Sequence, residues 1–274
     1  MYSKDNYTVL MFSMRIGKQG IPIYFKCFDG INNPDAFLDK TITDAIKEVS
    51  SLFDGTNFNL VFLADRWFNS EAILSTINNL GHTYCIRFKS NIKIRIFDNK
   101  EGHYISKYTG ELTGYKYKGK YYNDVFIYEN SNFKSNIIIS KSDSIDEHWI
   151  ILSNGNNNQA IKNYSYRFGG IECVFKNQKS NGFYIECINN ANIKSFTTMY
   201  MCVCFCITYL TIIGSDYSKN SKCYKNFKIE THKNLKGVKT RVISLFHTGL
   251  ILFKRAFNSC VYIRLPFSFK LYDV

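Results

Sequence analysis

The chain has 274 residues, of which 45% are hydrophobic and 21% are charged, with 35 Lys and Arg against 22 Asp and Glu and a formal net charge of +13. This composition is that of an ordinary globular protein, and it excludes a chain that is disordered, collagen-like or coiled-coil throughout. The positive charge fits a polyanionic partner, although charge alone does not establish one.

The N-terminal residues predict a β-hairpin followed by a helix. Residues 7–14 and 21–27 are rich in β-branched and aromatic side chains, and a glycine-containing turn separates them. Asn33 is a suitable helix N-cap and Pro34 is a suitable first helical residue, so we expect a helix from there to about Phe53.

A strand, a helix and a second strand are expected next. The apolar run 60–63 suits a buried strand, residues 70–80 suit a helix that begins at a Ser N-cap, and residues 84–88 suit another strand. Residues 89–157 are rich in Tyr, Ile and Lys, with glycine turns and little helical periodicity. This stretch therefore predicts a β-rich insertion.

The C-terminal half is expected to be mainly helical. Residues 159–179 predict a helix that is broken at residues 169–170, where two glycines are adjacent. An apolar helix over 196–214 follows, and then a polar and basic stretch over 216–240 that predicts an exposed loop. Residues 242–257 predict a last helix.

The segment 196–214 is apolar enough to be compared with a membrane span. It has 19 uncharged residues, close to the about 20 that a spanning helix needs. It also contains Thr, Tyr and Cys, and its most apolar part is shorter than a span. We therefore favour a buried core helix and keep a membrane span as the alternative. Nine cysteines, none in Cys-x-x-Cys spacing, and a start without a basic-then-apolar leader favour reduced thiols in a cytoplasmic protein.

Two carboxylates stand out by their positions. Asp65 follows the predicted strand 60–63, at the edge of an α/β sheet where ligands gather; a helix cap or an ion pair is the simpler interpretation. Glu172 and Lys179 are seven residues apart, so they lie about 20° apart around a helix. A carboxylate and an ammonium group on one face suit a metal ion and a phosphate, whereas a solvated charged face is the simpler interpretation.

The segment that holds Glu172 resembles the signature helix of DDE-class transposases of the insertion-sequence-four family. That signature is Tyr, two residues, Arg, three residues, Glu, six residues, Lys. Tyr164, Arg167, Glu172 and Lys179 follow it, with one extra residue between the Arg and the Glu. Residues 63–68, Leu-Ala-Asp-Arg-Trp-Phe, are similar to the family's second-Asp motif. The order of predicted elements from about residue 7 to the end is similar as well.

The resemblance implies an α/β fold, with an RNase H-like mixed sheet, helices on both faces and a β-rich insertion before the Glu-bearing helix. It also implies phosphoryl transfer with two Mg²⁺ or Mn²⁺ ions about 4 Å apart. Carboxylates would hold these ions, because hard cations prefer oxygen ligands. Asp65 and Glu172 would then be the catalytic residues and metal ligands, and we expect them to converge at one end of the sheet.

The partner implied is DNA, at transposon terminal inverted repeats and at target sites, with a homodimer as a candidate assembly and no membrane. Tyr164 and Arg167 would grip phosphates at the transposon end, and Lys179 would add positive charge there. Trp149 is a candidate for stacking on a flipped base, and a core Trp in a strand is the favoured alternative. The expected location is the bacterial cytoplasm, at the nucleoid when the chain is bound to DNA.

The chain departs from the family pattern at two places. The extra residue rotates Arg167 by about 100° around a continuous helix unless a π-type bulge absorbs it, and residues 169–170 are a suitable place for one. The family's first Asp lacks a clear counterpart, because Asp5 is the sole acid before residue 7 and lies in a turn-like sequence. We therefore expect an N-terminally truncated transposase that is inactive by itself, with Asp5 as a doubtful first catalytic residue.

The expected organisation has four segments. Residues 1–88 form the first part of an RNase H-like core, 89–157 form the β-rich insertion, 158–215 hold the Glu-bearing helix and the core helix, and 216–274 form a basic loop with a C-terminal helical region. Two alternatives to a transposase remain open. One is a non-catalytic DNA-binding remnant of such an enzyme, and the other is a membrane-associated protein that uses 196–214.

Overall fold

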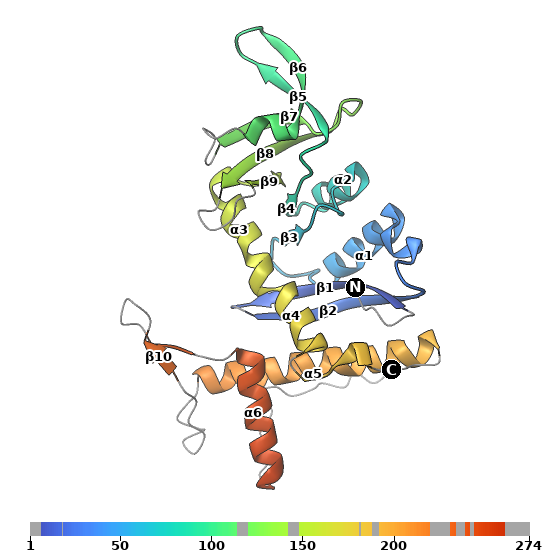
Figure 1. Ribbon diagram of the computed structural model, residues 1–274, viewed down its shortest axis with the longest axis vertical. Helices are drawn as coiled ribbons and strands as arrows, with labels where there is room; N and C mark the ends of the chain where they lie inside the picture. The colour runs from blue at the N-terminus through green and yellow to red at the C-terminus, as the bar shows by residue number, and fades with distance from the viewer. Residues whose placement is uncertain are drawn as a thin grey trace. The chain divides into compact units, whose positions relative to one another are not determined.

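The computed structural model describes residues 7–17, 19–113, 120–141, 148–180, 182–187, 192–219, 231–233, 239–241 and 244–260 (Figure 1). The contacts within the chain divide it into two compact units. One unit is Pro34–Arg167, and the other combines Met1–Asn33 with Phe168–Val274. The N-terminal hairpin therefore belongs to the same unit as the C-terminal helices.

The unit Pro34–Arg167 is built on a seven-stranded mixed sheet with the order β3-β4-β9-β8-β7-β5-β6. β3 and β4 are parallel, and every other neighbouring pair is antiparallel. The strands of the predicted β-rich insertion are confirmed, and they continue the same sheet as β3 and β4. The strand bounds are β3 Val61–Ala64, β4 Thr83–Arg87, β5 Lys93–Asp98, β6 His103–Tyr108, β7 Lys120–Phe126, β8 Lys134–Lys141 and β9 His148–Ser153.

Residues 60–63 were predicted to form a buried strand. A strand does form there, but the prediction that it is buried is wrong. β3 is an edge strand, which pairs within the described residues with β4 on one side only. Val61 is exposed, and Phe62, Leu63 and Ala64 are half-buried. An apolar run does not reveal how many neighbours a strand has, because pairing depends on distant parts of the chain.

The first predicted helix is divided into two elements. Residues Pro34–Phe37 form a 3₁₀ turn (η1), and α1 begins only at Asp39 and ends at Ser51, because Leu38 between them has an extended backbone. The second predicted helix is confirmed as α2, Glu71–Asn79, whose N-cap is Ser70. The Ser70 hydroxyl accepts the Ile73 N–H at 3.4 Å, as a capping residue should.

Helix α3, Asn157–Gly169, covers one face of the central strands. Ala160 and Tyr164 of α3 pack against Cys85 of β4, Ile138 of β8 and Ile151 of β9. The opposite face of the same strands is also buried. Its side chains, each no more than 1% exposed, include Tyr84, Ile86 and Leu152. The mixed α/β class is thus confirmed, with a core on both faces of the sheet.

In the other unit, β1 (Tyr7–Ile16) and β2 (Gln19–Asp29) form the predicted antiparallel hairpin. Among the described strands the hairpin is a two-stranded sheet of its own, separate from the seven-stranded sheet. The pairing register shifts between Phe12 and Ser13. Asp5 lies outside the described residues.

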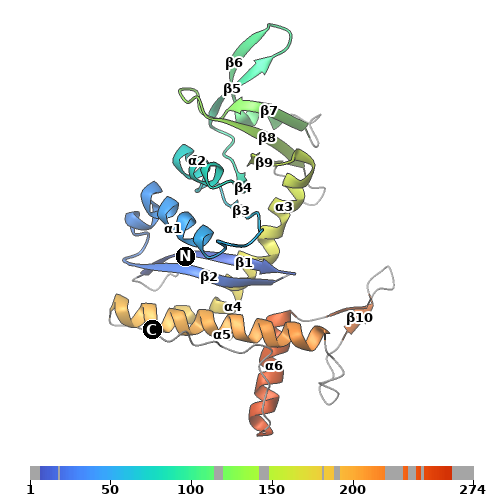
Figure 2. The same cartoon turned by 180° about the vertical axis from the view of Figure 1, so that it is seen from behind.

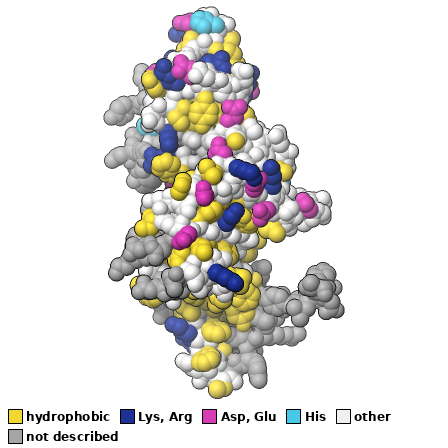
Figure 3. Space-filling view, turned by 90° about the vertical axis from the view of Figure 1, so that its right-hand side faces the viewer, with side chains coloured by type: hydrophobic (Ala, Val, Ile, Leu, Met, Phe, Trp, Pro, Cys, Tyr) yellow, Lys and Arg dark blue, Asp and Glu magenta, His cyan; other side chains and the backbone are white. Residues whose placement is uncertain are grey.

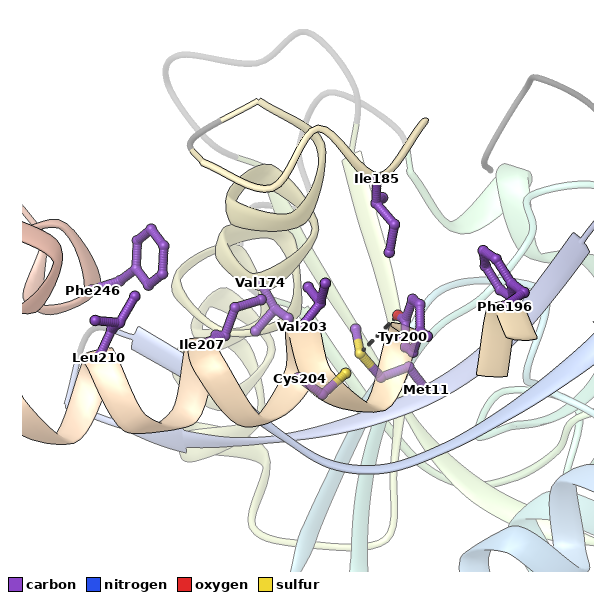
Figure 4. Packing of buried hydrophobic residues seen from close by; sticks show 10 residues of the cluster. All are labelled: Met11, Val174, Ile185, Phe196, Tyr200, Val203, Cys204, Ile207, Leu210 and Phe246. Atoms are coloured by element: carbon purple, nitrogen blue, oxygen red, sulfur yellow. Dashed lines mark hydrogen bonds between the residues drawn. The ribbon is translucent and has the colours of Figure 1, made fainter. Parts of the chain in front are cut away.

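The predicted core helix over 196–214 is confirmed and is longer than expected. It is α5, Ile193–Lys219, and it runs along the hairpin (Figures 1 and 2). Tyr200 and Ile207 are fully buried against Met11 of β1 and Val174, in the cluster that Figure 4 shows. Among the described residues, one helical segment, Ile193–Ser218, is long and apolar enough to cross a membrane. Of its most apolar stretch 44% is buried, and the buried side chains pack against the hairpin and Val174.

The last predicted helix is confirmed as α6, Leu245–Asn258, which begins after its N-cap Ser244. The predicted loop over 216–240 is wrong at its start, because α5 continues to Lys219. Two short strands follow within that stretch and beyond it, β10 (Thr231–Lys233) and β11 (Lys239–Arg241), and they pair antiparallel. A short 3₁₀ turn, η3 (Ile185–Cys187), lies between the helix that holds Glu172 and α5.

Candidate functional site

Asp65 and Arg167 form an ion pair that joins the two segments of the sequence resemblance. Asp65 follows the last residue of β3, and its Oδ1 accepts the Arg66 N–H at 2.8 Å. Its Oδ2 lies 3.3 Å from Nη2 of Arg167, in the last turn of α3 and 102 residues further along the chain. Both side chains are partly exposed, Arg167 by 18% and Asp65 by 34%. The simpler interpretation of Asp65, as an ion-paired strand-end residue, therefore describes its contacts.

Tyr164 lies in the core beside this pair, and the half-buried Trp149 packs against it. Tyr164 stands one turn before Arg167, whose guanidinium carbon is 6.0 Å from the centre of the Tyr164 ring. The Trp149 ring, from β9, meets Tyr164 edge-on at 5.4 Å. Burial is the main cause that raises the pKa of the Tyr164 hydroxyl. This packing favours the core interpretation of Trp149, and its stacking on a flipped base stays a prediction, as does a phosphate contact of Tyr164.

The helix that carries the signature is interrupted between Arg167 and Glu172. α3 ends at Gly169 and α4 runs over Ile171–Lys179, so the expected break at residues 169–170 is confirmed and replaces a π-type bulge. A Cβ added to Gly20 of β2 would lie 2.6 Å from the Gly170 carbonyl oxygen. The break therefore places backbone directly against backbone, which requires glycine at Gly20.

Glu172 and Lys179 occupy the two ends of α4. Glu172 is exposed in the first turn, where a carboxylate interacts favourably with the helix dipole. Lys179 lies in the last turn, and its Nζ is 2.7 Å from a carboxylate oxygen of Glu186. Lys179 is therefore engaged with an acidic neighbour, and its contribution to a phosphate site stays a prediction.

The predicted site residues are shared between the two units. Trp149, Tyr164, Arg167 and Asp65 are brought together in the unit Pro34–Arg167, whereas Glu172 belongs to the other unit. The convergence of Asp65 and Glu172 stays a prediction. In the part of the chain that the structure describes, no three His, Cys, Asp or Glu residues are grouped so as to hold a metal ion.

Sequence reasoning missed Trp67 and Lys89 as candidate binding residues. Trp67 follows Asp65 by two residues and is 71% exposed. The Lys89 ammonium group lies 4.5 Å above its ring, which is the geometry of a cation–π contact. An exposed Trp beside a cation suits a nucleotide base better than the packed Trp149 does. The sequence did contain a signal for Trp67. It stands in the same motif as Asp65 but beyond the end of the predicted strand, where a side chain can be exposed.

No family model matches the chain, and no curated protein matches it. The resemblance to transposases therefore rests on residues 63–68 and 164–179 and on the order of the elements around them.

The Asp65–Arg167 pair is expected to contribute a measurable coupling energy. A double-mutant cycle with Asp65→Ala and Arg167→Ala should give about 1 kcal/mol, because the two groups are partly shielded from solvent. The matched control is the exposed pair Lys40–Asp44 on α1, one helical turn apart, for which a smaller coupling is expected. Unfolding by urea measures both cycles. A coupling no larger than that of the control would show that the Asp65–Arg167 contact does not persist in solution.

Proposed function

We propose that this chain is a transposase of the DDE class, resembling the insertion-sequence-four family, whose activity is DNA strand cleavage and strand transfer at transposon ends. The observation that carries the proposal is the contact between Asp65 and Arg167. The two residues come from separate motifs that resemble the same family, and neither motif alone requires them to meet. An RNase H-like arrangement of the catalytic core belongs to the proposal.

The surroundings of the pair suit a nucleic-acid substrate. Asp65 stands at the carboxyl end of β3 in the parallel pair β3–β4, which is where α/β sheets place their ligands. The guanidinium of Arg167 has the forked shape that recognises phosphate oxygens. Trp67, two residues after Asp65, adds an exposed ring, and Lys89 adds a cation over that ring. The net charge of +13 favours DNA as the partner.

The proposal includes Mg²⁺ or Mn²⁺, with Asp65 and Glu172 as the residues that would hold two ions. Such ions stabilise charge on the attacking and leaving oxygens of a phosphoryl transfer. Within its own unit Asp65 is engaged by the Arg66 N–H and by Arg167. The metal site therefore depends on Glu172, which makes Glu172→Gln as informative a variant as Asp65→Asn.

Binding to the DNA that flanks the gene tests the proposal, because the ends of an insertion sequence lie there. Arg167→Ala is expected to lower the affinity for flanking duplexes by at least about tenfold, the effect of losing one charge-assisted hydrogen bond, and to affect scrambled duplexes less. The matched control is Arg255→Ala, which removes an exposed Arg from the last turn of α6. Fluorescence anisotropy measures the affinities of the wild-type chain and of both variants for both kinds of duplex. Equal losses on flanking and scrambled DNA would contradict a role for Arg167 at transposon ends.

A second candidate function is DNA binding without catalysis. It is favoured by the engagement of both Asp65 oxygens in contacts within the protein. Nicking of the flanking DNA in the presence of Mg²⁺ or Mn²⁺ distinguishes the two functions. Nicking that is lost in Asp65→Asn and in Glu172→Gln supports the enzyme, whereas specific binding without nicking supports the non-catalytic protein.

A further inference from the structure

The outer strands of the seven-stranded sheet carry an exposed face of aromatic and basic side chains. The register pairs β5 with β6 and β7, and β7 with β8, so that paired residues project from one face. We call this set the basic-aromatic face. Its members are Lys93, Arg95 and Phe97 of β5, Tyr104 and Tyr108 of β6, Phe126 of β7 and Lys134 of β8.

Burial along β5 separates this face from the core. Ile94 and Ile96 point to the opposite side and are 0% and 8% exposed. Phe97 is 53% exposed and Tyr108 is 45% exposed, although both are large hydrophobic residues. Hydrophobic side chains also reach the surface beside Lys and Arg in the space-filling view (Figure 3). Among the described residues, this face therefore exposes to solvent large hydrophobic side chains of the kind that are usually buried in a core.

Contacts within the face join the rings and the cations. The Arg95 guanidinium carbon lies 4.2 Å from the centre of the Phe126 ring, and Lys134 Nζ lies 4.9 Å from it. The rings of Tyr104 and Phe126 are 4.8 Å apart, and those of Tyr104 and Phe97 are 5.4 Å apart. The aromatic surface is therefore continuous across three strands and has positive charge beside it.

The basic-aromatic face carries a net positive charge. Its members include three cations and no carboxylate. Glu129, after β7, lies 3.5 Å from Lys93, and Arg95 donates to the Ser131 carbonyl at 2.7 Å. Lys134 is exposed next to the rings, which makes it the cation best placed for an added anion.

We propose that the basic-aromatic face binds unpaired nucleotides of single-stranded nucleic acid. Bases would stack on the exposed rings of Phe97, Tyr104 and Tyr108, and phosphates would meet Lys134. A row of exposed rings with cations between them is the arrangement that holds single strands without reading their sequence. A duplex fits less well, because its bases are already stacked on each other. Tyr104 and Tyr108 lie about 13 Å apart along β6, so a segment of several nucleotides is needed to contact both.

This inference goes beyond the proposed function, and it rests on residues that neither family motif contains. The face is on the same side of the sheet as α3, since Lys134 and Ile138 alternate to one side of β8 and Ile138 packs under α3. A single strand on the face would therefore lie on the side of the sheet from which Arg167 approaches Asp65. The binding itself does not require that Asp65 or Glu172 be catalytic.

Anisotropy of labelled oligothymidylate and oligouridylate tests the proposal on the full chain. Tyr104→Leu and Tyr108→Leu keep apolar volume but remove the ring, and each is expected to weaken binding about fivefold or more, the lower range for one stacked base. The matched control is Phe58→Leu, which removes a 70% exposed ring elsewhere in the same unit. Lys134→Gln should lower the slope of log affinity against log salt by about 0.7, whereas Lys100→Gln, at the tip of the β5–β6 hairpin, should not.

The outcomes separate this proposal from the proposed function. Weaker binding of either oligonucleotide by the face variants, with unchanged thermal unfolding, supports the basic-aromatic face, and the two arms show whether DNA or RNA is preferred. Tyr108→Phe should retain the affinity, because it keeps the ring. Affinity for both oligonucleotides that is unchanged in the double variant Tyr104→Leu, Tyr108→Leu would overturn it. Loss of discrimination at flanking DNA in Arg167→Ala tests the other proposal alone.

Discussion

Gly214→Ala is expected to lower the free energy of unfolding by about 2 kcal/mol or more. α5 and α6 meet at two glycines, and a Cβ at Gly214 would lie 1.9 Å from the Leu245 carbonyl oxygen. At Gly249, a Cβ would lie 1.8 Å from the Leu210 carbonyl oxygen. Both obstacles are backbone atoms, so a side-chain rotation cannot relieve them, and the helices must separate. Overpacking of this kind costs about 1–3 kcal/mol or more.

The sign of this effect is informative, because alanine usually stabilises a helix. In an open helix the same substitution would gain up to about 1 kcal/mol from propensity alone. The matched control is Ser218→Ala, one turn further along α5, which we expect to be neutral or slightly stabilising. Thermal unfolding measures both, at about 2–4 °C for each kcal/mol in a protein of this size. A midpoint that is unchanged or raised in Gly214→Ala would show that α5 and α6 do not cross at these glycines.

The crossing of α5 and α6 at two glycines shows the limit of prediction from sequence. The helix itself could be predicted, but its contact with α6 could not. The apolar run predicts a helix, and its Thr, Tyr and Cys favour a core helix over a membrane span. The residue on the other helix that meets Gly214 depends on α6, more than thirty residues later. A local pattern does not contain that information. The same limit applies to β3, whose strand character was predicted but whose edge position was not.

Site residues that belong to a sequence motif could be predicted. Contacts that depend on how distant parts of the chain pack could not. The motif segments identified Asp65 and Arg167, and the structure brings these two together. The break at residues 169–170 was visible as two glycines, but its partner, Gly20, was not. The sequence does not show that Trp67 is exposed whereas Trp149 is packed. That difference depends on where each strand ends and on which strand a helix covers.

The DNA binding that we propose is expected to weaken about a hundredfold when the salt concentration is raised fourfold. The net charge of +13 makes phosphate contacts the main source of affinity. Each contact contributes about 0.9 to the slope of log affinity against log salt, so about four contacts give this loss. Anisotropy titrations of a duplex at several salt concentrations measure the slope. An affinity that does not change with salt would contradict an electrostatic mode of binding.

The structure further predicts that Arg167, beside Asp65, and Lys89, beside Trp67, contribute differently to that slope. Arg167 is already paired with a carboxylate, so on reaching a phosphate it exchanges one anion for another and releases few counterions. Lys89 faces the neutral ring of Trp67, so its contact with a phosphate should release a full counterion. Lys89→Gln is therefore expected to lower the slope by about 0.9, and Arg167→Ala by clearly less, even where it lowers the affinity more. The control Lys40→Gln, on α1 and paired with Asp44, should leave the slope unchanged. Equal reductions for Lys89→Gln and Arg167→Ala would mean that Asp65 does not hold Arg167 in the free protein.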